Sequence, residues 1–138
     1  MMHNPHPRPD VLALLVQALD TPEHPVSSGE DERLDASTRP HTVVQTRPLQ
    51  HGRYSRWSFR VHTTLMTFAS SSTTAYDAHT EVADRLLELN YLGETNDWFV
   101  SAVVCEMEPV NIAGQSAPGW DGQTSTYEFF IRHKGGGA

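Results

Sequence analysis

Cysteine and long apolar runs are what this sequence of 138 residues most clearly lacks. Cys105 is the only cysteine, so no disulfide can form within the chain. No apolar run approaches the ~20 residues of a membrane-spanning helix, which argues against a transmembrane protein. The first ten residues contain no apolar core of the signal-peptide type, and we expect a protein that is not secreted.

Motifs that carry catalysis or hold cofactors are also missing. The eight histidines are scattered, with no HxxxH spacing on an expected helix and no cysteine pair to complete a metal site. No glycine-rich dinucleotide motif, P-loop or GxSxG motif is present. Cys105 lies within an apolar run, where a thiol usually packs as a small hydrophobic side chain. We therefore expect no enzymatic activity, no metal and no cofactor.

Basic residues are outnumbered by acidic ones. The chain has 10 lysines and arginines against 17 aspartates and glutamates, for a formal net charge of −7. Binding to a phosphate backbone needs clustered Lys and Arg side chains, so this balance argues against an ordinary nucleic-acid-binding protein.

The stretch from residue 54 to residue 90 predicts a long strand followed directly by an amphipathic helix. Apolar and polar side chains alternate with period two over residues 57–69, which is typical of a half-buried strand. The pattern then becomes helical, and Thr74 with Asp77 resembles a capping box. Gly93 is a plausible stop signal. The apolar stripe of this helix comprises Ala75, Ala78, Val82, Ala83, Leu86, Leu87 and Leu89.

Six further segments complete the prediction. A nearly all-apolar helix is expected over Val11–Leu19, with Asp10 as its N-cap. Residues 20–40 and 110–123 are expected to be long loops. Strands are expected over residues 42–46, 98–108 and 124–133. Because residues 98–108 are apolar on both faces, we expect that strand in the centre of the sheet.

Together these elements predict one α+β domain over residues 10–133. The expected fold is an antiparallel-rich sheet of about four strands with helices on one face, in the order α-β-β-α-β-β. It includes a long hairpin and long loops, with flexible tails over residues 1–9 and 134–138.

Two groups of residues are candidate interaction surfaces. One is an acidic row at steps of four, three and four on the main helix, although a solvated helix face would show the same spacing. The other joins arginines and aromatics of the long hairpin with the tip of the last loop, residue types that are frequent in protein interfaces. The candidates are Asp77, Glu81, Asp84 and Glu88 on the helix, Arg53, Tyr54, Arg56 and Trp57 in the hairpin, and Trp120 and Asp121 in the loop.

The order and lengths of these elements resemble the tail terminator proteins of long-tailed bacteriophages, in particular those of actinobacteriophages. The resemblance covers residues 10–133. It lies in the leading apolar helix, the proline-led strand after Pro40, the long strand that runs into an alanine-rich helix, and two closing strands of which the last is aromatic-rich.

This resemblance implies a structural virion protein that is not an enzyme. Such proteins form a homo-hexameric ring at the head-proximal end of the tail tube, stop its growth and join the tail to the head connector or stopper protein. The resemblance further implies that genomic DNA passes through the lumen without sequence-specific binding, and that the ring is assembled in the host cytoplasm. An acidic lumen would let DNA slide, since a basic wall would hold phosphate.

Other classes of protein fit the same sequence. One alternative is another head–tail joining, stopper or tail completion protein. A second is a small α+β ligand-binding domain or enzyme, which predicts a closed apolar pocket with converging polar groups. A third is a regulatory interaction domain, which predicts a compact dimer without projecting arms.

Overall fold

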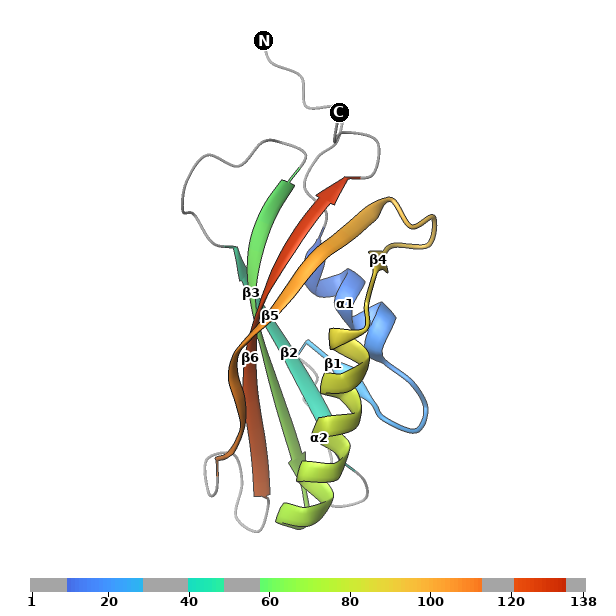
Figure 1. Ribbon diagram of the computed structural model, residues 1–138. Coiled ribbons are helices and arrows are strands. Elements are labelled where there is room, and N and C mark those ends of the chain that lie inside the picture. Colours follow the sequence, from blue (N-terminus) through green and yellow to red (C-terminus); the bar gives the residue numbers. More distant parts are fainter. Residues whose placement is uncertain (1–9, 29–39, 49–57, 113–120, 134–138) are drawn as a thin grey trace.

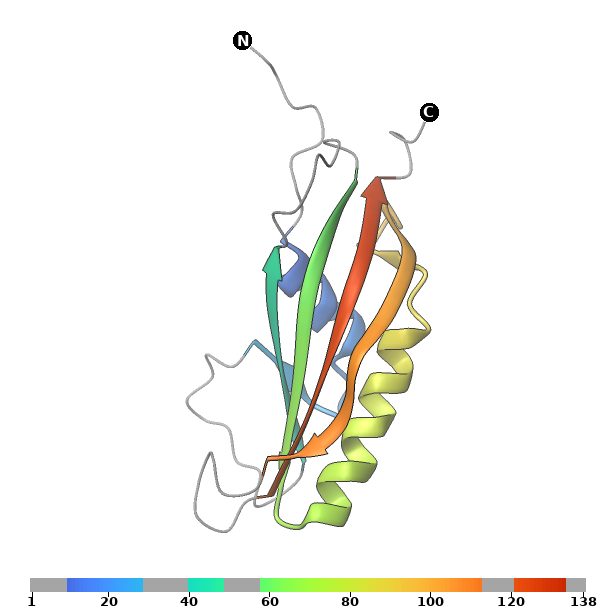
Figure 2. The same cartoon turned by 60° about the vertical axis from the view of Figure 1, so that its left-hand side comes forward.

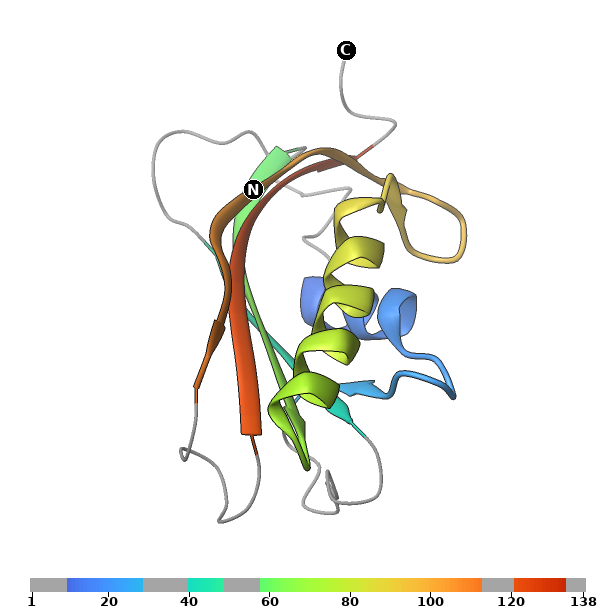
Figure 3. The ribbon, with the colours of Figure 1, turned by 60° about the horizontal axis from the view of Figure 1, so that its bottom comes forward.

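The computed structural model describes residues 10–28, 40–48, 58–112 and 121–133. One six-stranded sheet has the strand order β1-β2-β3-β6-β5-β4. It curls into a half-barrel, and both helices lie on its concave side (Figures 1 and 3). The elements are α1 (Val11–Leu19), β1 (Val26–Ser27), β2 (His41–Pro48), β3 (Ser58–Ala69), α2 (Ser72–Leu87), β4 (Tyr91–Leu92), β5 (Trp98–Asn111) and β6 (Asp121–His133).

This architecture overturns the predicted α+β fold with four antiparallel strands. The sheet has six strands and is mixed, because β1 pairs with β2 in parallel. The element order is α-β-β-β-α-β-β-β. Two-residue strands carry no periodicity, so β1 and β4 are invisible to a pattern search. β1 contains a single buried valine in a polar segment, Val26, which pairs with Thr42 of β2.

The alternation in β3 and the stripe of α2 were predicted correctly where the structure describes them. Val61, Leu65 and Ala69 are buried on the concave face of β3. Helix α2 returns over this face and buries its small residues against it, whereas Leu87 is exposed and does not widen the stripe as expected. The buried residues of α2 are Ala75, Ala78, His79, Val82, Ala83 and Leu86.

The N-terminus of α2 differs from the predicted capping box. Ser71 is the N-cap, and its Oγ accepts a hydrogen bond from the Thr74 backbone N–H at 3.2 Å. The chain is extended at Ser71, which leaves that side chain free to turn back onto the first turn. The helix ends at Leu87, and Gly93, with φ 93°, lies in the turn after β4.

The strand predicted to be central lies near one edge of the sheet. β6 and β3 are central, and β5 lies between β6 and the two-residue β4 (Figure 2). Three register shifts interrupt its pairing with β6. Bulges of this kind increase the local twist and bend a strand, which accounts for the curl of the sheet.

A glycine allows two side chains to meet over the end of β6. A Cβ at Gly122 would lie 2.7 Å from Cγ1 of Ile112 and 3.1 Å from Cδ1 of Phe68. Both side chains therefore lie directly against the backbone of residue 122. This close approach needs a residue without a side chain.

Candidate functional site

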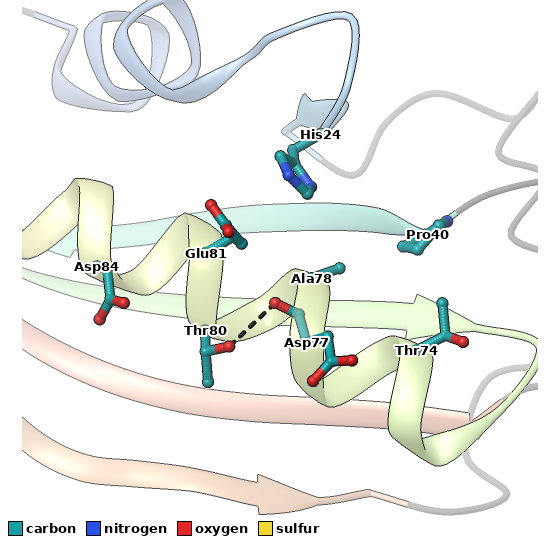
Figure 4. Close-up of a pocket in the computed structure, with 8 residues that line it drawn as sticks. All are labelled: His24, Pro40, Thr74, Asp77, Ala78, Thr80, Glu81 and Asp84. Carbon is teal, nitrogen blue, oxygen red and sulfur yellow. Dashed lines mark hydrogen bonds between the residues drawn. The ribbon is translucent and has the colours of Figure 1, made fainter.

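The predicted acidic row is present on α2. Asp77, Glu81, Asp84 and Glu88 are all exposed. At 100° per residue they lie opposite the buried stripe of the helix, so they point away from the sheet. The first three line an open groove of about 470 Å³, and the groove is also lined by His24, which precedes β1, and Pro40, which precedes β2 (Figure 4).

Of the remaining predicted site residues, Asp121 alone lies within the described part of the chain. Asp121 is half-buried at the start of β6, where it pairs with Ala69 of β3. The other five predictions lie outside the described residues, namely Arg53, Tyr54, Arg56, Trp57 and Trp120.

The convex side of the sheet carries arginines stacked on aromatic rings. We call this side, which faces away from both helices, the outer face. Arg132 of β6 lies 5.9 Å from the ring centre of Phe99, which in turn lies 5.7 Å from the ring of Tyr91. Arg60 of β3 lies 5.6 Å from the ring of Phe130. Strand pairing brings these side chains together: Phe99 lies opposite both Tyr91 and Arg132 on its two neighbouring strands, and Arg60 lies opposite Phe130.

Beyond Val100, β5 is exposed over most of its length. In residues 101–111 only Val103 and Pro109 are half-buried, and all other residues are exposed. Val104, Met107 and Val110 expose 48%, 37% and 44% of their surface. Each is paired with a β6 residue of the outer face. They form a row of aliphatic side chains in solvent, which we call the β5 row.

The edge of β5 is poorly suited to pairing with another strand. Besides its three register shifts, it contains Pro109, which has no backbone N–H, and the exposed carboxylates Glu106 and Glu108. Bulges, prolines and charges are the devices that protect sheet edges. Cys105 is exposed here, contrary to its predicted packing role. The pKa of its thiol is raised, first by partial desolvation and then by the negative charge of Glu108.

A chain of hydrogen bonds crosses the buried side of the sheet. His79 of α2 is fully buried, with Nδ1 2.8 Å from Thr67 Oγ1 and Nε2 2.6 Å from Ser125 Oγ. Thr67 Oγ1 lies 2.8 Å from Thr42 Oγ1, and Ser125 Oγ donates to Tyr127 Oη at 2.8 Å. These hydrogen bonds link β2, β3, α2 and β6.

The direction of this chain sets the tautomer of His79. Ser125 has one hydroxyl hydrogen and gives it to Tyr127, so it must accept from Nε2–H of His79. Nδ1 is then the acceptor for the Thr67 hydroxyl. Burial lowers the pKa of His79 to about 4, which keeps the imidazole neutral at physiological pH.

The sequence pattern favours a hydrogen-bonded histidine at the boundary of the helix stripe for residue 79, whereas the structure buries this side chain fully within the stripe. The available signal was the position of His79 beside Ala75 and Ala78, within the stripe itself. The arginine and aromatic pairs were missed because their members lie far apart in the sequence. Strand register brings Phe99 and Arg132 together, and no local pattern reveals that register.

The described residues contain no group of three or more His, Cys, Asp or Glu side chains placed to hold a metal ion. Within that same part of the chain, no helix is long and apolar enough to cross a membrane. Comparison with models of known protein families and with curated proteins returned no match.

Proposed function

We propose that this chain is a subunit of the ring that terminates the tail tube of a long-tailed bacteriophage. In this proposal the ring is a homo-hexamer at the head-proximal end of the tube. It stops tube growth and contacts the tail tube protein on one side and the head connector or stopper protein on the other. The role is structural, without catalysis or cofactor, in a virion assembled in the host cytoplasm.

The observation that best supports this proposal is the β5 row. Val104, Met107 and Val110 are exposed together on a strand that has solvent on both faces. Grouped apolar side chains at a protein surface mark contacts with other subunits. Since the edge of β5 disfavours strand addition, we propose that a partner packs on these side chains.

The net charge supports the same proposal. DNA leaves the head through the lumen of such a ring, and a chain with a net charge of −7 repels phosphate. We propose that DNA passes without sequence-specific binding. The measured sign of the lumen potential would test this point independently.

A ligand-binding domain is less well supported. Such a domain would bury a ligand in a concave apolar pocket. The groove beside α2 is open and is lined largely by Thr, Asp and Glu side chains. A stopper or tail completion protein remains the second candidate, because an exposed apolar strand supports any head–tail joining role equally well.

Native mass and negative-stain images over a range of concentrations test the proposal, with and without purified tail tubes. We expect rings of about six subunits, or rings at one end of the tubes only. A compact dimer, or a monomer that leaves tube ends bare, would contradict it. Rings bound to connectors but never to tubes would support the stopper alternative.

A variant of the β5 row links this test to the structure. Val104→Asp places a charge in the row and is expected to abolish rings or tube capping. Ala13→Asp adds the same charge at an exposed site in the first turn of α1, where a carboxylate suits the helix dipole. This control should assemble like the unaltered protein.

A further inference from the structure

Exposed large apolar side chains occur on two surfaces of the described part of the chain. Tyr76 and Leu87 lie on α2, with exposed fractions of 51% and 44%. The second group lies on the outer face of the sheet and combines Tyr91, which is 46% exposed, with the β5 row. Each surface therefore offers apolar area for a contact.

The two surfaces differ in charge. The α2 surface carries the acidic row of four exposed carboxylates, Asp77, Glu81, Asp84 and Glu88. The outer face carries three arginines, Arg47, Arg60 and Arg132, together with Glu128 and with Glu106, whose carboxylate lies 3.6 Å from Nε2 of His62. Arg60 is paired with Glu128, whereas Arg132 is exposed and lies over the ring of Phe99. An arginine stacked on an aromatic ring keeps its N–H groups available for a carboxylate.

The two surfaces face in opposite directions. Helix α2 packs on the concave side of the sheet (Figure 3). Its acidic row lies opposite its buried residues, and strand register places the arginines on the convex side. One copy cannot bring its own two surfaces together. Two copies can do so only through a head-to-tail contact, and repetition of such a contact generates a ring when the rotation closes.

We propose that the outer face of one copy docks onto the acidic row of α2 of the next copy. Arg132 pairs with carboxylates of that row, while Tyr91 and the β5 row pack beside Leu87 and Tyr76. The proposal rests on the proposed function and identifies the two surfaces that join ring subunits. Charge complementarity selects a second copy over nucleic acid, because a chain of net charge −7 repels phosphate.

Reversal of one charge on each surface tests the contact. Arg132→Glu alone and Asp84→Arg alone each place like charges opposite one another. Each is expected to raise the concentration for half-maximal assembly by about tenfold or more. Both residues are exposed, and thermal unfolding would verify that each variant folds.

A mixture of the two variants gives the sharpest result. In an alternating ring, Glu at residue 132 meets Arg at residue 84 at one contact, and the unaltered charges meet at the next. We expect the mixture, and also the double variant in one chain, to assemble like the unaltered protein. Glu94→Arg makes the same change of charge in the turn after β4 and is expected to leave assembly unchanged.

If both single variants assembled at the same concentration as the unaltered protein, the docking proposal would be overturned. Rings of the unaltered protein would still support the terminator role. Loss of assembly in the single variants without recovery in the mixture would also overturn it. An unaltered protein that neither assembles nor caps tubes would overturn the proposed function, and the docking proposal with it.

Discussion

At the scale of single residues, the buried hydroxyls of β3 have different energetic roles. Thr67 joins the series of hydrogen bonds that reaches His79, whereas Oγ1 of Thr63, which is also fully buried, has no hydrogen-bond partner among the described residues. An unsatisfied buried polar group costs about 1–3 kcal/mol. The two threonines lie on the same face of one strand and so form a matched pair for mutation.

Replacement by valine is expected to change stability in opposite directions at these two sites. Thr67→Val leaves Nδ1 of His79 and the Thr42 hydroxyl without their partner and should lower the free energy of unfolding by about 1–3 kcal/mol. Thr63→Val removes an unsatisfied group at equal volume and should raise it by about 1 kcal/mol. Urea unfolding measures both, and equal losses would contradict this account.

The lowered pKa of His79 makes stability depend on pH. The folded state binds the proton at about pH 4 and the unfolded state at 6.5, so between these values the unfolded chain holds more protons. The contribution of His79 to the free energy of unfolding is complete above pH 6.5 and is lost as the pH falls towards 4. The loss should approach about 3 kcal/mol, by the relation of 1.36 kcal/mol per pKa unit.

Unfolding between pH 4 and 7.5 in the unaltered protein and in His79→Gln measures this contribution. The glutamine variant has no group that titrates at residue 79, so its stability should fall less steeply over the same range. Parallel curves for the two proteins would show that other groups cause the dependence.

At the scale of elements, the start of α2 depends on one serine. Ser71→Ala removes the acceptor for the Thr74 N–H and is expected to cost about 1 kcal/mol. Thr74→Ala keeps the Ser71 cap and should cost less. Had Thr74 been the N-cap, as the sequence pattern indicated, this order would be reversed, and comparison of the two variants by thermal unfolding decides it.

Element type and element position differ in how far the sequence predicts them. The period of two in β3 and the helical stripe of α2 are local patterns, and both were recognised. The predicted central position of β5 was wrong because apolar residues on both faces of a strand usually indicate burial on both faces. Here α2 covers β3 and β6 and leaves the outer part of β5 in solvent (Figure 3).

At the scale of the whole molecule, two sides differ in charge, with four exposed carboxylates on α2 and three arginines and two glutamates on the outer face. If these sides join neighbouring copies, assembly should weaken with salt. A change from about 0.1 M to about 1 M ionic strength shortens the Debye length from about 10 Å to about 3 Å. We expect the concentration for half-maximal assembly to rise about tenfold, as measured by analytical ultracentrifugation. Purely apolar contacts would respond in the opposite direction, because salts such as sulfate strengthen burial of apolar surface.

The sequence by itself determined the long strand and the helix that follows it, the absence of disulfides within the chain and the acidic row. These properties depend on residue identity and on spacing along one element. Only the tertiary structure decided that the sheet has six strands, that His79 is part of a buried hydrogen-bonded chain, and that arginines stack on aromatic rings across the outer face. The physical reason is that strand register and sheet curvature join residues distant in the chain, and no local pattern encodes those contacts.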